Sequence, residues 1–329
     1  MTVEIGRRRF IAALGASAAW PLAAAARAAD AWPTRPVTVI CPFSAGLSTD
    51  LLMRLVASAL SDALGQNFII ENRPGANGNI GAGVVAKAAP DGYTLFVGTV
   101  GPIVNNKVLY KEMDFDPERA FAPVAALSYS ALMIDGTPKI PPKNFKELIA
   151  YAKANPGKLN AGSVGSGSQA HITAELINKL AGISIGHVPY RNANEELPDL
   201  ISGDLQLGIQ YIPSFVPNVQ AGTIRGLAVT SLARLPQLPD IPTVDESGLP
   251  GFEATGWEAL FAPAGTPREI IDKINAAVNA YLKSDAGRAQ LDKIWMTPMG
   301  GTPEDLAAFL AREKAKWWPI IKEANITLE

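Results

Sequence analysis

Two short segments rich in glycine and serine carry the groups best suited to bind a ligand. They cover residues 42–50 and 163–171, lie over a hundred residues apart, and contain no lysine or arginine. Each follows an apolar stretch typical of a strand and precedes a helical pattern. Backbone N–H groups in such a turn and at the start of a helix attract an anion. We therefore expect one anionic ligand to be held from two sides.

The candidate ligand-binding residues lie in these segments and in two later strands. The first segment supplies Phe43, Ser44, Ala45, Gly46, Leu47, Ser48, Thr49 and Asp50, and the second supplies Ser163, Gly165, Ser166, Gly167, Ser168 and His171. Predicted strands add Tyr190 and Gln206. Capping of the following helix is an equally good interpretation of Ser48, Thr49 and Asp50. For Gln206 the alternative is an ordinary strand residue.

The sequence lacks the patterns of most catalytic and cofactor sites. The chain has two histidines, and His171 with Glu175 has no third ligand nearby, so no metal site is predicted. Residues 165–170 fit the glycine pattern of dinucleotide-binding turns, but the acidic residue that such sites need is missing. No cofactor is expected. The enzymatic alternative is a hydrolase that uses Ser44 or Ser166 with His171, although the Gly-x-Ser-x-Gly motif is absent.

The first 29 residues have the features of an export signal. Arg7, Arg8 and Arg9 form a twin-arginine pattern, an alanine-rich apolar stretch follows, and residues 26–28 offer a small-x-small cleavage site. The only cysteine, Cys41, lies inside a predicted strand, which argues against a lipoprotein anchor. We expect residues 1–29 to be a twin-arginine-type signal peptide and the mature protein to lie in the periplasm.

Composition excludes several classes of protein. The chain carries 29 basic and 31 acidic side chains, and loss of the signal removes four arginines and one glutamate, leaving 25 and 30 and a net charge of −5. There is no basic run of the kind that binds nucleic acid. Beyond the signal, no apolar run is long enough to span a membrane. A single cysteine excludes an internal disulfide, so the hydrophobic core must stabilise the fold.

The order of strands and helices predicts an α/β protein with two lobes. Strands are expected at residues 37–41, 68–71, 93–99, 124–134, 159–162, 186–190, 205–212, 224–230 and 257–262, and helices at 49–64, 79–89, 144–154, 169–180 and 194–202. Helix starts at Thr266 and Thr302 are expected to be capped by threonine. This alternation predicts mainly parallel sheets flanked by helices, and it begins again after residue 134.

The restart suggests where the lobes divide. We expect lobe 1 to comprise residues 30–127 and 232–329, and lobe 2 to comprise residues 128–231. The chain would then cross twice between the lobes and form a hinge, with the ligand cleft between them.

Several motifs, in order, resemble those of one family. Residues 32–37, followed by Cys41–Gly46 and Asp50, resemble the start of mature tripartite tricarboxylate transporter substrate-binding proteins, the TctC-like or Bug family of periplasmic solute receptors. Further matching motifs lie at residues 71–76, 89–94, 162–171, 187–191, 227–231, 239–244 and 261–267. Together they span nearly the whole mature chain.

The resemblance implies a two-lobed type II periplasmic-binding-protein fold. Such a receptor closes on a small organic carboxylate and delivers it to two integral membrane transporter subunits. In the family, the segments matching residues 43–50 and 163–171 hold a ligand carboxylate largely through main-chain groups and ordered water. We expect a monomer that catalyses no reaction and binds no nucleic acid. A sensory receptor of the same fold, which presents its closed form to a signalling partner, is the alternative.

This chain departs from the family pattern at three places. Leu47 stands where members commonly have a second glycine, and because its side chain resists positive φ, a narrower or more apolar pocket is predicted. Residues 192–195 replace a glycine-rich stretch. Gln206 stands where an aspartate is common, which favours a plain organic acid over an amino acid, because no carboxylate there would meet an ammonium group.

Overall fold

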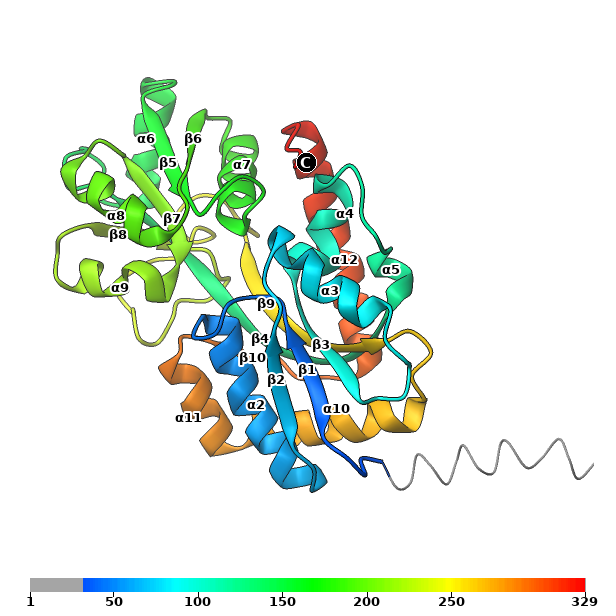
Figure 1. The fold of residues 1–329 in the computed structure, drawn as a ribbon. Helices are drawn as coiled ribbons and strands as arrows, with labels where there is room; N and C mark the ends of the chain where they lie inside the picture. The colour runs from blue at the N-terminus through cyan, green and yellow to red at the C-terminus, as the bar shows by residue number, and fades with distance from the viewer. Residues whose placement is uncertain (1–31, 329) are drawn as a thin grey trace, which may run out of the picture.

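The fold is an α/β architecture in which helices flank a curled sheet (Figure 1). The computed structural model describes residues 32–328, and the expected signal peptide lies outside these residues. The strands are β1 (Val37–Cys41), β2 (Phe68–Asn72), β3 (Thr94–Thr99), β4 (Phe121–Gly136), β5 (Leu159–Ser163), β6 (Ile185–Pro189), β7 (Leu207–Tyr211), β8 (Arg225–Val229), β9 (Thr255–Pro263) and β10 (Thr297–Pro298). The helices are α2 (Ser48–Leu64), η1 (Ala76–Gly78), α3 (Asn79–Ala86), η2 (Gly101–Asn105), α4 (Asn106–Leu109), α5 (Pro117–Ala120), α6 (Phe145–Ala154), α7 (Gln169–Ala181), α8 (Ala193–Ser202), α9 (Ile212–Gln220), α10 (Arg268–Lys283), α11 (Asp285–Lys293) and α12 (Pro303–Glu323). Within residues 32–328, no helix has both the length and the apolar character needed to cross a membrane.

The ten strands form one mixed sheet. Its order is β2-β1-β3-β9-β4-β7-β5-β6, and β10 and β8 also pair with β4. β1, β2 and β3 are parallel to one another, and so are β5, β6 and β7. β4 and β9 run antiparallel to their neighbours and join the two parallel groups. The predicted α/β class is confirmed, and the joining strands make the sheet mixed.

β4 passes from one parallel group to the other. Its residues 121–131 pair with β9, whereas from Leu132 onward it pairs with β7 and β8. The chain returns beside it, where the Leu132 N–H donates to Thr230 Oγ1 at 2.8 Å. Figure 1 shows a group of helices on each side of this crossing. The crossing is therefore the place where the two halves of the molecule are joined by backbone.

The lobe boundaries expected from the sequence, 127/128 and 231/232, remain predictions. The change of strand partner in β4 lies four residues after the first of them. Near the second, one hydrophobic cluster includes Met133 and Ile212 together with Leu238 and Ile241. Side chains on either side of the second boundary thus share one core.

Helices cover both faces of the β1–β3 group because β1 is apolar on both sides. Val37 and Val39 belong to the same hydrophobic cluster as residues of α2 and α10, and Ile40, on the other face, belongs to the cluster that includes residues of α3 and α12. In α2 the residues facing the core recur every three or four positions, at Leu52, Met53, Val56 and Leu60. This packing anchors α2 along its length and so positions its first turn.

Several details differ from expectation. The elements η1, η2, α4, α5, α11 and β10 were not predicted. Thr266 does not cap α10, because its hydroxyl donates to the Pro263 carbonyl and the helix begins after Pro267. Helix α9 was not predicted, and its first residue falls inside an expected strand. Prolines at its second residue and in its interior hide the helical pattern. By contrast, Thr302 caps α12 in a full capping box with Asp305, as expected.

Candidate functional site

The two glycine-rich segments both follow strand ends that point toward the crossing in β4. Segment 42–50 follows β1, which is parallel to β3. The last residue of β3 pairs with Glu258 in β9, and Glu258 pairs with Ser128 in β4. Segment 163–171 follows β5, whose parallel neighbour β7 ends at Tyr211, opposite Leu132 in β4. Open α/β sheets bind ligands at such carboxyl ends. The fold therefore directs both segments to the same junction.

Segment 42–50 is held in shape by the carboxylate of Asp50. This buried side chain accepts from the Gly46 N–H and from Arg54 Nε at 2.9 Å each, and from Asn72 Nδ2 at 2.9 Å. Asn72 also donates to the Phe43 carbonyl. Burial alone would raise the pKa of Asp50, but these bonds hold it below its ordinary value. Asp50 thus braces the turn, and its acceptor sites are used by the protein.

The start of α2 is left without a cap. Leu47 occupies the N-cap position with φ −76° and provides no side-chain bond, while only Gly46 before it takes a positive φ, of 85°. Within residues 32–328, the backbone N–H groups of Ser48, Thr49 and Asp50 have no hydrogen-bond partner. Leu47 is 53% exposed, and residues 44–48 are exposed as a run. This helix start offers unpaired donors, of which Ser48 belongs to the exposed run while Thr49 and Asp50 are buried residues.

Beneath the same helix start lies a buried acid. Thr49 Oγ1 donates to Glu258 Oε1 at 3.3 Å, and Ser128 Oγ donates to Glu258 Oε2 at 3.1 Å. Glu258 and Ser128 are direct partners across β9 and β4. Burial raises the pKa of Glu258 to about 7, although the two hydroxyl bonds oppose the shift. The sequence analysis did not single out Glu258, because nothing in its local motif marks a carboxyl group that the fold buries under another segment.

Segment 163–171 is shaped by its own side chains. Ser168 caps α7 by accepting from the His171 N–H at 3.3 Å, and the Gly167 N–H donates to His171 Nδ1 at 3.1 Å. Within residues 32–328, the N–H groups of Gly165 and Ser166 have no partner. Ser166 is exposed, whereas Gly167 is buried. In the same residues the N–H groups of Gln169 and Ala170 at the start of α7 also lack a partner, so the available donors run from the centre of the segment into the first turn of the helix.

The two histidines lie under this segment as a stacked pair. Their ring centroids are 3.7 Å apart at an interplanar angle of 7°. His187 Nε2 lies 2.7 Å from Ser163 Oγ, which also donates to the Gly165 carbonyl. Burial and the neighbouring His187 lower the pKa of His171 to about 4, and burial lowers that of His187. Both rings are therefore neutral at neutral pH and serve to hold the turn.

Segment 163–171 also touches the other half of the molecule. A Cβ placed on Gly167, whose φ is 74°, would lie 3.0 Å from Leu328 Cδ1 and 3.2 Å from Leu109 Cδ1. Leu109 ends α4, and Leu328 pairs with Tyr110 through a β-bridge. The close approach explains a glycine here, and it brings the segment against elements that pack on β1–β3.

The remaining predicted residues are placed differently from one another. Tyr190 lies beside the segment, since its N–H donates to the Ser163 carbonyl, but its hydroxyl donates to Asp199 at 2.8 Å. Gln206 lies before β7, next to Asn160 at the start of β5, and accepts from the Asn160 N–H. The pairing of Leu207 with Gly136 places Gln206 opposite Thr137, roughly 17 Å along β4 from the crossing at Leu132. The structure does not bring Gln206 to the two segments.

Nothing in this arrangement resembles an activated nucleophile. Within the part of the chain that the structure describes, no hydrogen bond joins His171 to Ser44 or Ser166. Ser163, which does contact a histidine, is 1% exposed. In the same residues there is no cluster of three histidine, cysteine or acidic side chains suited to a metal ion.

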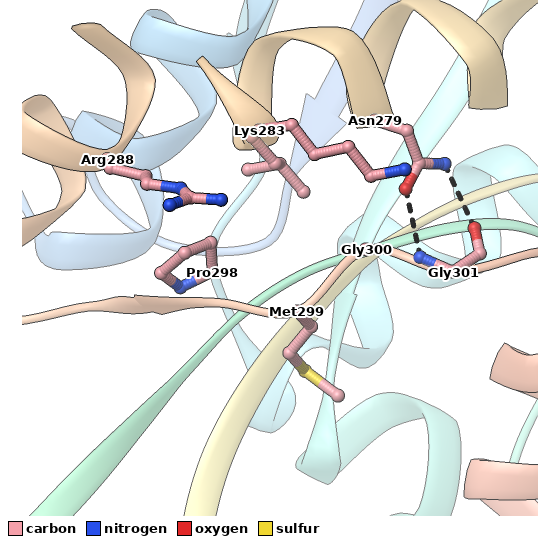
Figure 2. A pocket seen from close by; sticks show the side chains of 8 residues that line it. Asn279, Lys283, Arg288, Pro298, Met299, Gly300 and Gly301 are labelled. Atoms are coloured by element: carbon pink, nitrogen blue, oxygen red, sulfur yellow. Dashed lines mark hydrogen bonds between the residues drawn. The ribbon is translucent and has the colours of Figure 1, made fainter. Parts of the chain in front are cut away.

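Figure 2 shows a surface cavity that lies outside both segments. It measures about 280 Å³ and is lined by residues of α10, α11 and the stretch around β10, none of them among the predicted site residues. Asn279 bonds to both the N–H and the carbonyl of Gly301, and Lys283 and Arg288 lie at the rim. The cavity lies where residues 298–301 pack against α10.

Comparisons with known proteins identify relatives along nearly the whole chain. Residues 52–326 match the family model described as tripartite tricarboxylate transporter family receptor. Protein BugT of Bordetella pertussis is 33% identical over 322 residues, which cover 98% of this chain and 99% of that protein. Rpa4515 of R. palustris, solved with adipate, is 40% identical with a TM-score of 0.79, covering 90% of this chain and 99% of that one. MatC of Rhodopseudomonas palustris, solved with bound malate, is 33% identical with a TM-score of 0.74, covering 88% and 100%.

Proposed function

This chain belongs to the tripartite tricarboxylate transporter receptor family, and from that premise we propose that it captures a small dicarboxylate between segments 42–50 and 163–171. It is a solute-binding receptor whose family handles carboxylates. The proposal concerns the residues that hold the ligand and the kind of acid that they select.

The uncapped start of α2 is the observation that supports this site most strongly. Three backbone N–H groups, at Ser48, Thr49 and Asp50, point out of a helix end with no partner in residues 32–328. A carboxylate is the natural partner of such donors, and each helix-end interaction contributes about 0.3–1 kcal/mol when exposed and more when partly buried. Because neither segment has a lysine or arginine, backbone donors and hydroxyls carry the recognition.

A second carboxylate is expected at the other segment. The unpaired N–H groups of Gly165 and Ser166 lie next to the start of α7, at the strand ends on the far side of the crossing. One anion-binding turn on each side of the crossing suits a ligand with two acidic ends. Adipate and malate, found with two relatives, are both of this kind. Because Gln206 lies outside the site, it does not select the ligand. Amino acids are expected to bind poorly because the one acidic side chain of the segments, Asp50, already accepts bonds from the protein and is not free to meet an ammonium group.

We place the receptor in the periplasm and propose that it delivers its ligand to the membrane subunits of a tripartite transporter. Family membership supports this role over catalysis. A sensory role would use the same ligand and the same closure, and the genes next to this one distinguish the two.

A thermal-shift screen of residues 30–329 tests the proposal. The set would contain adipate, malate, monocarboxylates, tricarboxylates and amino acids. A dicarboxylate at a hundred times its Kd should stabilise the fold by about 2.7 kcal/mol and raise Tm by several degrees. Loss of that shift in Ser48→Pro, which removes one unpaired N–H at the first position of α2, where the fixed φ of proline fits the helix, would support the site. An equal shift for amino acids, or none for any acid, would contradict it.

A further inference from the structure

Glu258 is a buried carboxyl group placed directly under the proposed anion site. The residue is 7% exposed, and its two oxygens accept from Thr49 in α2 and Ser128 in β4. Thr49 also supplies one of the unpaired N–H groups at the start of α2. The same residue thus contacts the acid through its side chain and is offered to the ligand through its backbone.

A carboxylate bound at the start of α2 would lie close to this acid. The bond from Thr49 Oγ1 to Glu258 is 3.3 Å, so a ligand oxygen on the Thr49 N–H lies within roughly 9 Å of the Glu258 carboxyl group. At that separation and an effective dielectric near 20, two unit negative charges repel enough to change a binding equilibrium roughly twentyfold. Protonation of Glu258 removes the repulsion.

Within residues 32–328, the groups bonded to Glu258 are the Thr49 and Ser128 hydroxyls, and no basic side chain lowers its pKa. The titratable group facing it is the phenol of Tyr211, whose pKa is raised by burial and by Glu258. Asp50 and Arg54, on the same turn of α2, bond to each other instead. From β4 the facing partner is the Ser128 hydroxyl, which also contacts Met296 Sδ at 3.5 Å. Protonation is therefore the means by which this pocket loses its negative charge.

We propose that Glu258 takes up one proton from solvent when a carboxylate ligand binds at the start of α2, so that capture and protonation are linked. The inference rests on the proposed function. In this proposal Glu258 does not contact the ligand. It acts through its charge and through its hydrogen bond with Thr49. Capture is then tightest where Glu258 is already protonated and weakens as pH rises.

Isothermal titration with adipate at pH 6.5 and pH 8.5 tests the linkage. At both values the ligand is almost fully ionised. For the wild-type protein we expect Kd to rise about tenfold between them, because burial raises the pKa of Glu258 to about 7 and the ligand raises it further. Phosphate and Tris have different heats of ionisation, so titrations in the two buffers near pH 7.7 measure how many protons the protein takes up on binding. We expect between half and one proton per adipate bound.

Glu258→Gln should have the same Kd at pH 6.5 and pH 8.5 and should show no buffer-dependent heat. A glutamine keeps an acceptor for Thr49 and imitates the protonated acid. Glu196→Gln is the matched control, because burial also raises the pKa of Glu196 to about 7 and its partner is Gln210, outside both segments. That variant should keep the tenfold change.

Two results overturn the linkage. One is adipate binding with the same Kd at both pH values in the wild-type protein, and the other is a tenfold change that survives in Glu258→Gln. If neither adipate nor malate binds at pH 6.5, the two-segment site itself fails, and the linkage fails with it.

Discussion

Single side chains under segment 163–171 set its shape through hydrogen bonds that require a neutral histidine. His171 Nδ1 accepts from the Gly167 N–H, and a protonated ring has no free acceptor at that atom. Burial and the stacked His187 disfavour the charged ring and lower the pKa of His171 to about 4. The turn whose central N–H groups are proposed to bind the ligand is thus maintained by a ring that resists protonation.

The pH dependence of stability should reflect this histidine. Its pKa in the folded state lies below the unfolded value, so its contribution is fully present above about pH 6.5 and is lost as pH falls toward 4. Between pH 7 and pH 4.5 the free energy of unfolding of the wild-type protein should fall by roughly 2 kcal/mol more than that of His171→Asn. The asparagine keeps an acceptor near Gly167 but does not titrate. Urea unfolding at the two pH values measures the difference. Equal losses in the two proteins would show that the ring is not responsible.

At the scale of elements, the helices divide by how they begin. Side chains cap α5, α6, α7, α8, α11 and α12, through Asp116, Asn144, Ser168, Asn192, Ser284 and Thr302, whereas α3, α4, α9 and α10 have no side-chain cap. Helix α2 likewise begins at Leu47, with no side-chain cap. A helix of 17 residues held along one apolar face tolerates this loss, and the N–H groups at its start remain available.

Leu47→Ser should therefore exchange affinity for stability. A serine at the N-cap accepts from the N–H groups of the first turn and should raise the free energy of unfolding by about 0.5–1 kcal/mol. The same N–H groups are the proposed ligand donors, so the dicarboxylate Kd should rise roughly fivefold. Chemical denaturation and titration calorimetry measure the two effects. Leu47→Ala, which removes the exposed side chain without adding an acceptor, is the control, and an equal loss of affinity there would point to the leucine side chain itself.

At the scale of the whole molecule, β4 and β9 connect the two parallel groups, and little free space remains at the crossing. A Cβ on Gly256 in β9 would lie 2.1 Å from the hydroxyl oxygen of Tyr211 at the end of β7. Gly256 pairs with Ser130, two residues before the change of partner in β4. This glycine allows a side chain of one group to reach the backbone of the other.

Gly256→Ala should disturb the crossing without touching either segment. Since Tyr211 would have to move, we expect a loss of about 1–3 kcal/mol in the free energy of unfolding. We also expect a smaller ligand-induced decrease in the radius of gyration, measured by small-angle scattering. Gly83→Ala in α3 is the matched control, because its nearest neighbour would be Phe115 at an ordinary 3.8 Å, and a helical glycine gains stability from alanine. A scattering change in Gly256→Ala equal to that of the wild type would show that the crossing does not govern closure.

Local pattern was enough to place most elements of this fold. Apolar runs and turn residues predicted both ends of β1 at the observed residues, and the ends of most other strands and helices to within about three residues. These signals succeed because they act between neighbours in the chain. The order of motifs indicated the family that the comparisons show. The antiparallel courses of β4 and β9 were not predicted, because strand direction is set by partners far away in sequence.

The sequence by itself also pointed to the two segments of the proposed anion site, since glycine, serine and the absence of cations are local properties. Only the tertiary structure decided what each residue in them does. It turned Asp50 into a brace through Asn72 and Arg54, and it placed Gln206 at the wrong end of β7 for the site. It also buried Glu258 under Thr49, 209 residues earlier in the chain. Burial and bonding depend on which distant residues meet, and in this protein strand pairing and the packing of α2 decide that meeting.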